Sequence, residues 1–317
     1  MRNLRTACIF LLSLLVAACG AIHEPAEKTI VPDAAPAAGS RYHYAISVTR
    51  RSELPAEVAK EKAPEALRLM DFNLQGDVTV SITEVTASGY DLHWQADLTE
   101  PAPNTKPGAF DDIVRQKHLF ELNLPVDVSI DLRHARPDLS IRNIADLRRR
   151  MFIKARELLG AKAVDYGCAD ESEQTRCPLV RGSEARLAST IASEISPMFA
   201  CSSRRLGDAS LTHWREVRRG GDNNLEMAIE LNVHNRETDV HAGTMRLQLE
   251  AILDAESFKA ADEATEVVGK MLRGTRVTAD CTISTTSAMP FAVDFVERVA
   301  NTSPDVVVSS TVHFDRR

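Results

Sequence analysis

The sequence predicts an α+β fold: a curved, mostly antiparallel β-sheet, half-barrel-like, with helices packed on one face. Two observations predict it. Apolar and polar residues alternate through nearly every strand-like segment, which is typical of antiparallel sheets that are wet on one side. These segments fall into two blocks, residues 41–132 and 210–315, separated by a helical stretch at residues 143–196. Two similar β-rich lobes are the alternative arrangement.

The first block contains four alternating runs, at residues 42–48, 72–82, 90–98 and 122–132. Residues 86–89 are turn-like and predict a hairpin between the second and third runs. Pro125 in the fourth run favours an edge strand or a bulge, because proline has no N–H to donate. Residues 53–71 predict one helix broken at Pro64 or two short helices, and residues 100–117 predict a long polar connection.

Two helices are predicted in the middle of the chain, at residues 143–159 and 184–196, from apolar residues spaced three and four apart. Gly160 is suited to end the first helix, and Ser183 to cap the start of the second.

The second block has alternating runs at residues 225–233, 245–249, 277–283 and 306–314. Its periodicity also predicts a helix at residues 255–272, with Asp254 as its N-cap. Residues 289–301 fit both a strand and a helix.

The start of the chain is typical of a secretory signal peptide. Arg2 and Arg5 precede an apolar run at residues 7–18, which is too short to cross a bilayer as a permanent helix. Residues 16–19, Val-Ala-Ala-Cys, resemble the lipobox of bacterial lipoproteins. The resemblance implies cleavage before Cys19 and a diacylglyceryl group on its sulfur. Gly20 after that cysteine is similar to signals for delivery to the outer membrane, on the side that faces the periplasm.

The expected organisation follows from this start. Residues 1–18 form the signal peptide, residues 19–40 a lipidated cysteine with an Ala/Pro-rich tether, and residues 41–317 a single α+β domain. No later segment has the roughly 20 consecutive apolar residues that a membrane helix needs. We therefore expect the lipid to be the only membrane attachment.

The cysteine count agrees with lipidation. Four cysteines remain once Cys8 leaves with the signal and Cys19 is acylated: Cys168, Cys177, Cys201 and Cys281. An even number is expected in an oxidising compartment, and four cysteines allow three pairings. We favour Cys168–Cys177, which closes a short polar loop at little entropic cost. The remaining pair, Cys201–Cys281, would tie the end of a helix to a strand.

The net charge argues against a nucleic-acid partner. The chain carries a formal charge of −7, and removal of two signal-peptide arginines makes it −9. An acidic exported protein is a poor candidate for binding phosphate backbones. Residues 148–150, Arg-Arg-Arg, are best interpreted as the solvated face of a helix.

A search for catalytic and metal-binding motifs gives weak candidates only. The G-x-S-x-G, S-x-x-K, H-E-x-x-H and P-loop patterns are missing from the sequence. His234 and His241, with two acids between them, could bind zinc, but a polar hairpin tip is the favoured interpretation. Asp111 and Asp112 are better explained as part of a solvated loop than as an acid–base pair. We expect no cofactor.

The favoured function is that of a non-enzymatic, membrane-anchored envelope lipoprotein that binds an apolar ligand or another envelope protein. A curved sheet covered by helices can enclose an apolar cavity. Periplasmic lipoprotein carriers are similar in this general build, which is an analogy of architecture and not of motifs. The alternatives are a periplasmic enzyme with an unrecognised site and a purely structural lipoprotein.

Overall fold

The computed structural model describes residues 35–53, 71–101, 110–133, 137–170, 177, 179–180, 184–202, 212–220, 225–239, 241–259, 275–302 and 305–317. The strands in these ranges are β1 (Arg41–Glu53), β2 (Phe72–Val85), β3 (Gly89–Thr99), β4 (Val126–Asp131), β5 (Asp138–Ile141), β6 (Thr212–Gly220), β7 (Leu225–Asp239), β8 (Thr244–Lys259), β9 (Arg276–Ser284), β10 (Pro290–Thr302) and β11 (Asp305–Arg316). The helices are α4 (Phe110–Leu122), α5 (Ile144–Leu159) and α6 (Glu184–Ile195), with the 3₁₀ turns η1 (Gly160–Ala163) and η3 (Ser196–Phe199).

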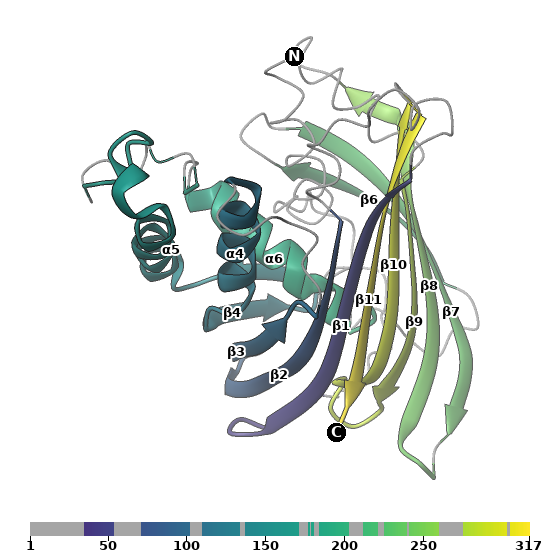
Figure 1. Ribbon diagram of the computed structural model, residues 1–317. Helices are drawn as coiled ribbons and strands as arrows, with labels where there is room; N and C mark the ends of the chain where they lie inside the picture. The colour runs from purple at the N-terminus through teal and green to yellow at the C-terminus, as the bar shows by residue number, and fades with distance from the viewer. Residues whose placement is uncertain are drawn as a thin grey trace.

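The strands form one 11-stranded sheet, in the order β5-β4-β3-β2-β1-β11-β10-β9-β8-β7-β6. Every neighbouring pair is antiparallel. From β1 in the middle of the sheet the strands run outward to β5, and the chain then crosses to β6 at the opposite edge and returns inward to β11. The two strand blocks of the sequence therefore meet at β1 and β11, which lie side by side in the curved sheet (Figure 1).

One face of the sheet is buried, as the alternation predicted. In β1, Tyr44, Ile46 and Val48 are buried and alternate with more exposed neighbours. Val48 lies opposite Leu74 of β2 on one side and Val312 of β11 on the other, and these two side chains are also buried. Burying each such side chain contributes about 1.5–3 kcal/mol. The repeated match of buried positions across neighbouring strands fixes the register.

The predicted hairpin between β2 and β3 is confirmed. The Thr86 N–H donates to the Gly89 carbonyl oxygen at 2.9 Å, and the Gly89 N–H donates to Thr86 Oγ1 at 3.0 Å. A Cβ atom at Gly89 would collide with the Ile130 carbonyl oxygen of β4. Glycine is therefore required here for the close approach of the next strand.

The two helices predicted in the middle of the chain are confirmed as α5 and α6. Gly160 ends α5 with a positive φ of 53°, and its N–H bonds to carbonyl oxygens of the last turn. Ser183 lies outside the described residues. Residues 289–301 fit both a strand and a helix in the sequence, and residues 290–301 belong to strand β10 rather than to a helix. Helix α5 contacts both α4 and α6, while α4 contacts β3 and α6 contacts β5.

The helix predicted at residues 255–272 is wrong for residues 255–259. Strand β8 continues through these residues, and Asp254, the expected N-cap, pairs with Ala228 of β7. Pairing with the long neighbouring strand outweighs the local helical periodicity. Residues 260–272, the rest of the predicted helix, lie outside the described residues.

Four predictions in the first block also need correction. Residues 110–122 form helix α4, so the polar connection is shorter than expected and the fourth run becomes a strand only at Val126. Strand β4 has neighbours on both sides, and the edge strand is β5. Pro125 precedes the ladder, and its carbonyl oxygen accepts a 3.1 Å hydrogen bond from the Asn143 side chain. Of the broken helix predicted at residues 53–71, Glu53 belongs to strand β1 instead, and residues 54–70 lie outside the described residues.

Candidate functional site

A pocket lies between helices α4 and α6 and strands β1, β3 and β4. Its apolar wall is formed by Ile46, Val48, Trp94, Ala96, Leu98 and Val126 from the strands and by Leu122, Leu187, Ile191 and Ile195 from the helices. The polar residues His118, Glu121, Thr190 and Glu194 complete the lining. The pocket volume is about 40 Å³, which is room for roughly three water molecules.

A buried arginine adjoins this pocket. Arg50 follows Val48 on the buried side of β1, and only 8% of its surface is exposed. Its Nη2 atom lies 3.3 Å from Glu194 Oε1 of α6. The guanidinium Cζ lies 4.8 Å from the centroid of the Phe72 ring, close enough for a cation–π contact. Among the described residues, Arg50 Nε has no hydrogen-bond partner.

Arg50 belongs to a polar row on the buried face. It lies opposite Ser310 of β11, and Ser310 lies opposite Glu297 of β10. Ser310 and Glu297 are each 5% exposed. The row next to it is apolar and consists of Val48, Val312 and Phe295. On the buried face of β1, β11 and β10, an apolar row is therefore followed directly by a polar row.

Helix α4 brings a second set of charges to the pocket. Glu121 forms an ion pair with Lys117 and lies 3.6 Å from His118 Nδ1. The His118 ring packs against Phe72, with the ring centroids 5.4 Å apart. Burial acts to raise the pKa of Glu121, but Lys117 and His118 together outweigh it and hold the pKa below its usual range.

Helix α4 is also attached to the sheet by Arg115. Its Nη1 donates a 2.8 Å hydrogen bond to the Asp71 carbonyl oxygen, just before β2, and its guanidinium forms an ion pair with Glu100, just after β3. Burial lowers the pKa of Arg115, while the Asp71 carboxylate acts to raise it. Neither Arg115 nor Glu100 lines the pocket.

The metal candidates lie away from the pocket. Strand β7 continues past Val233 to Asp239, so His234 lies within a strand opposite Gln248 instead of at a hairpin tip. His241 is exposed in the turn that leads to β8. In the described part of the chain, no three His, Cys, Asp or Glu residues are grouped so that they could hold a metal ion.

Asp112 lies in α4, not in a loop, and accepts a 2.8 Å hydrogen bond from the Gln116 side chain. Cys19 and the signal segment lie outside the described residues. No helix within the described ranges is long and apolar enough to cross a membrane.

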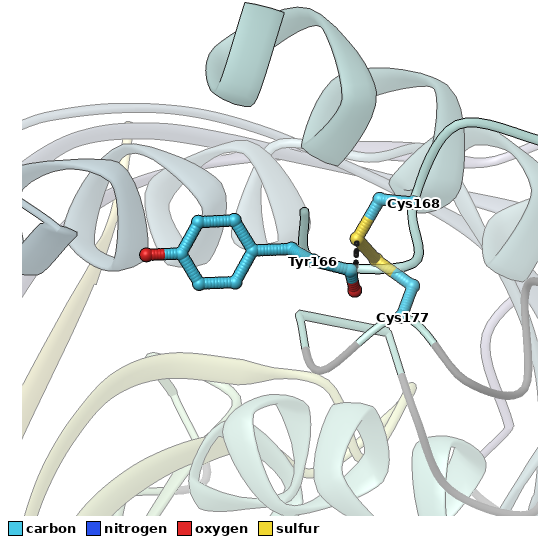
Figure 2. Close-up of a disulfide and its surroundings, with 3 residues drawn as sticks. All are labelled: Tyr166, Cys168 and Cys177. Atoms are coloured by element: carbon cyan, nitrogen blue, oxygen red, sulfur yellow. Dashed lines mark hydrogen bonds between the residues drawn. A yellow bond between two sulfur atoms is a disulfide. The ribbon is translucent and has the colours of Figure 1, made fainter. Parts of the chain in front are cut away.

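Both disulfides that the sequence favoured are present. Cys168 and Cys177 are bonded, and Cys168 Sγ lies 3.6 Å from the Tyr166 carbonyl oxygen, while the Tyr166 ring points away from the disulfide (Figure 2). The second disulfide joins Cys201, just beyond η3, to Cys281 of β9. It therefore attaches the chain that follows α6 covalently to the sheet.

The residue that sequence reasoning missed is Arg50. It occupies a position where the alternation of β1 predicts an apolar side chain, two residues after Val48. A charged residue at a predicted buried position could have been noticed in the sequence alone. Its partner Glu194 is 144 positions further along the chain, and no local pattern connects the two.

The sequence matches no protein-family model. It also matches no curated protein.

Proposed function

We propose that this protein is an envelope lipoprotein, anchored through Cys19 to the outer membrane and facing the periplasm. In this proposal its body binds an apolar ligand between the helices and the concave face of the sheet. The observation that carries the proposal is the pocket, whose wall combines apolar side chains from three strands and two helices. Ligand sites in proteins are commonly apolar clefts with a few placed polar groups.

The proposal requires the helices to cover one face of the sheet. Two observations support this placement. Residues of α4 and α6 share the pocket with buried-face residues of β1, β3 and β4. In Figure 1, α4 and α6 lie beside the part of the sheet formed by β2, β3 and β4, and α5 lies further out.

Ligand entry requires α6, α4 or both to move away from the sheet. The pocket volume of about 40 Å³ is far below the roughly 300–1,000 Å³ of ligand sites. The interface between helices and sheet contains the charged groups of Arg50, Glu194 and Glu121. Buried ion pairs stabilise an interface less than apolar packing of the same volume. Separation at this interface therefore costs less than opening an apolar core.

The anchor is tested by Cys19→Ser. This change removes the acylated sulfur, so we expect the protein to leave the membrane fraction for the soluble periplasmic fraction or to remain unprocessed. Intact mass should fall by the mass of the acyl groups in the first case. Cys8→Ser, inside the segment that is removed, is the matched control and should change neither mass nor location. Unchanged membrane association and mass in Cys19→Ser would contradict the anchor.

Ligand binding is tested on the full chain carrying Cys19→Ser. Lipid extraction and native mass spectrometry should detect a co-purifying apolar molecule, and the neutral probe N-phenyl-1-naphthylamine should bind with increased fluorescence. Ala96→Leu adds side-chain volume to the pocket wall and should weaken probe binding by about tenfold or more, because the pocket has no room to spare. Ala45→Leu, on the other face of β1, is the matched control. Equal probe binding by both variants, or none by the parent chain, would exclude this site.

A further inference from the structure

Arg50 has fewer partners than its burial requires. A guanidinium carries five N–H donors, and a buried charge is costly unless it is paired and hydrogen-bonded. The Arg50 side chain is 9% exposed, and its hydrogen bond to Glu194 is 3.3 Å long, which is beyond the usual range for a charge-assisted bond. Arg50 Nε has no partner among the described residues.

The position of Arg50 places this donor group at one end of the apolar wall. Val48 and Ile46 precede it on the same face of β1, at intervals of about 6.6–6.8 Å along the strand, and both line the pocket. Beyond Val48 the buried face becomes the polar row of Arg50, Ser310 and Glu297. An extended alkyl chain lying along Val48 and Ile46 would therefore have its polar end at Arg50.

Glu194 occupies the position that such a polar end would take. It lines the pocket from α6, and its side chain is 18% exposed, so its carboxylate has a route to water. Replacement of this carboxylate by another anionic group would keep the guanidinium paired, and a planar anion can bind it through two parallel hydrogen bonds. Glu297, two strands away, has an interaction of its own.

We propose that Arg50 binds the anionic end of the ligand, and that the site takes an alkyl chain ending in a carboxylate or a phosphate. This inference rests on the proposed ligand-binding function and specifies its ligand class. The anionic group displaces Glu194 from Arg50, which removes the polar attachment between α6 and β1 as the chain enters the pocket.

The test compares three chains of equal length: dodecanoate, dodecyl phosphate and dodecanol. Binding to the full chain carrying Cys19→Ser is measured by calorimetry and by displacement of N-phenyl-1-naphthylamine. At least one anionic chain should bind about tenfold or more tightly than dodecanol, the effect of one charge-assisted hydrogen-bonded pair. The stronger of the two anionic chains identifies a carboxylate or a phosphate as the preferred end.

Variants of Arg50 test whether its side chain causes the preference for anionic chains. Arg50→Gln should abolish the preference for the anionic chains over dodecanol, while Arg50→Lys should keep part of it. Arg51→Gln, at the exposed neighbouring position, is the matched control and should behave as the parent. Glu194→Gln removes the competing charge and should strengthen binding of the anionic chains selectively.

Three results would overturn the inference. Equal affinities of the parent chain for all three compounds, or the same anionic preference in Arg50→Gln, would show that Arg50 does not recognise the ligand, while the ligand-binding function would stand. Binding of none of the three compounds by the parent chain would overturn both proposals. Thermal unfolding of each variant verifies that it is folded.

Discussion

Helices α4 and α6 are each attached to the sheet through an arginine whose side chain is 9% exposed, but the two attachments differ in quality. Arg115 of α4 combines an ion pair to Glu100 with a 2.8 Å hydrogen bond to the Asp71 carbonyl oxygen. Arg50 of β1 holds α6 through one 3.3 Å hydrogen bond to Glu194. Two short contacts from separate segments restrict a guanidinium far more than a single long one.

This difference indicates which helix is free to move. Helix α4 is fixed near the ends of β2 and β3 by Arg115. Helix α6 is attached weakly at Glu194, and the chain that follows it is fixed covalently through Cys201–Cys281. We therefore expect α6 to separate from the sheet more readily than α4, while the chain at Cys201, beyond the end of the helix, stays in place.

The largest expected effect comes from breaking the two attachments in turn. Arg115→Met leaves the Glu100 carboxylate, whose side chain is 13% exposed, without its cation, and should lower the free energy of unfolding by about 3 kcal/mol. Arg50→Met should cost only about 1 kcal/mol, because a long single bond is lost and methionine can pack against Phe72. Urea unfolding measures both values.

Arg51→Met is the control for this pair of variants. Its side chain is exposed, so the free energy of unfolding should stay within about 0.5 kcal/mol of the parent value. If Arg115→Met and Arg50→Met lower the free energy of unfolding equally, the two attachments are equivalent. The expectation that α6 separates more readily than α4 would then be wrong.

The sheet was largely predictable because its signal is local. Alternation with period two places Tyr44, Ile46 and Val48 on one face whatever lies beside them. The pairing Cys168–Cys177 was favoured for a similar reason, since the two residues are nine positions apart. Gly160 could be placed at the end of α5 because glycine readily adopts the positive φ that often follows a helix.

The features that escaped prediction depend on distant partners. Residues 255–259 have helical periodicity but extend β8, in which Asp254 and Lys259 pair with β7 on either side of a register shift. Most of helix α4 was mistaken for a polar connection, and its last residue, Leu122, for the start of a strand. The candidate site depends on contacts between Arg50 and Glu194, and only the folded chain places a β1 side chain against a helix 144 residues away.

The smallest expected effect concerns Glu121, which tests how much the charge pairs within α4 at the pocket contribute to stability. The pKa of Glu121 is lower in the folded chain than the usual value of about 4.3. A lowered folded-state pKa stabilises the fold at pH values above the unfolded pKa, and this contribution is lost as the pH falls through the folded pKa. Glu121→Gln should therefore be less stable than the parent at pH 7. At pH 3 the difference should shrink, because a protonated glutamate resembles glutamine. Denaturant unfolding at both pH values measures it, and a difference independent of pH would show that the ion pair with Lys117 within α4 contributes nothing to stability.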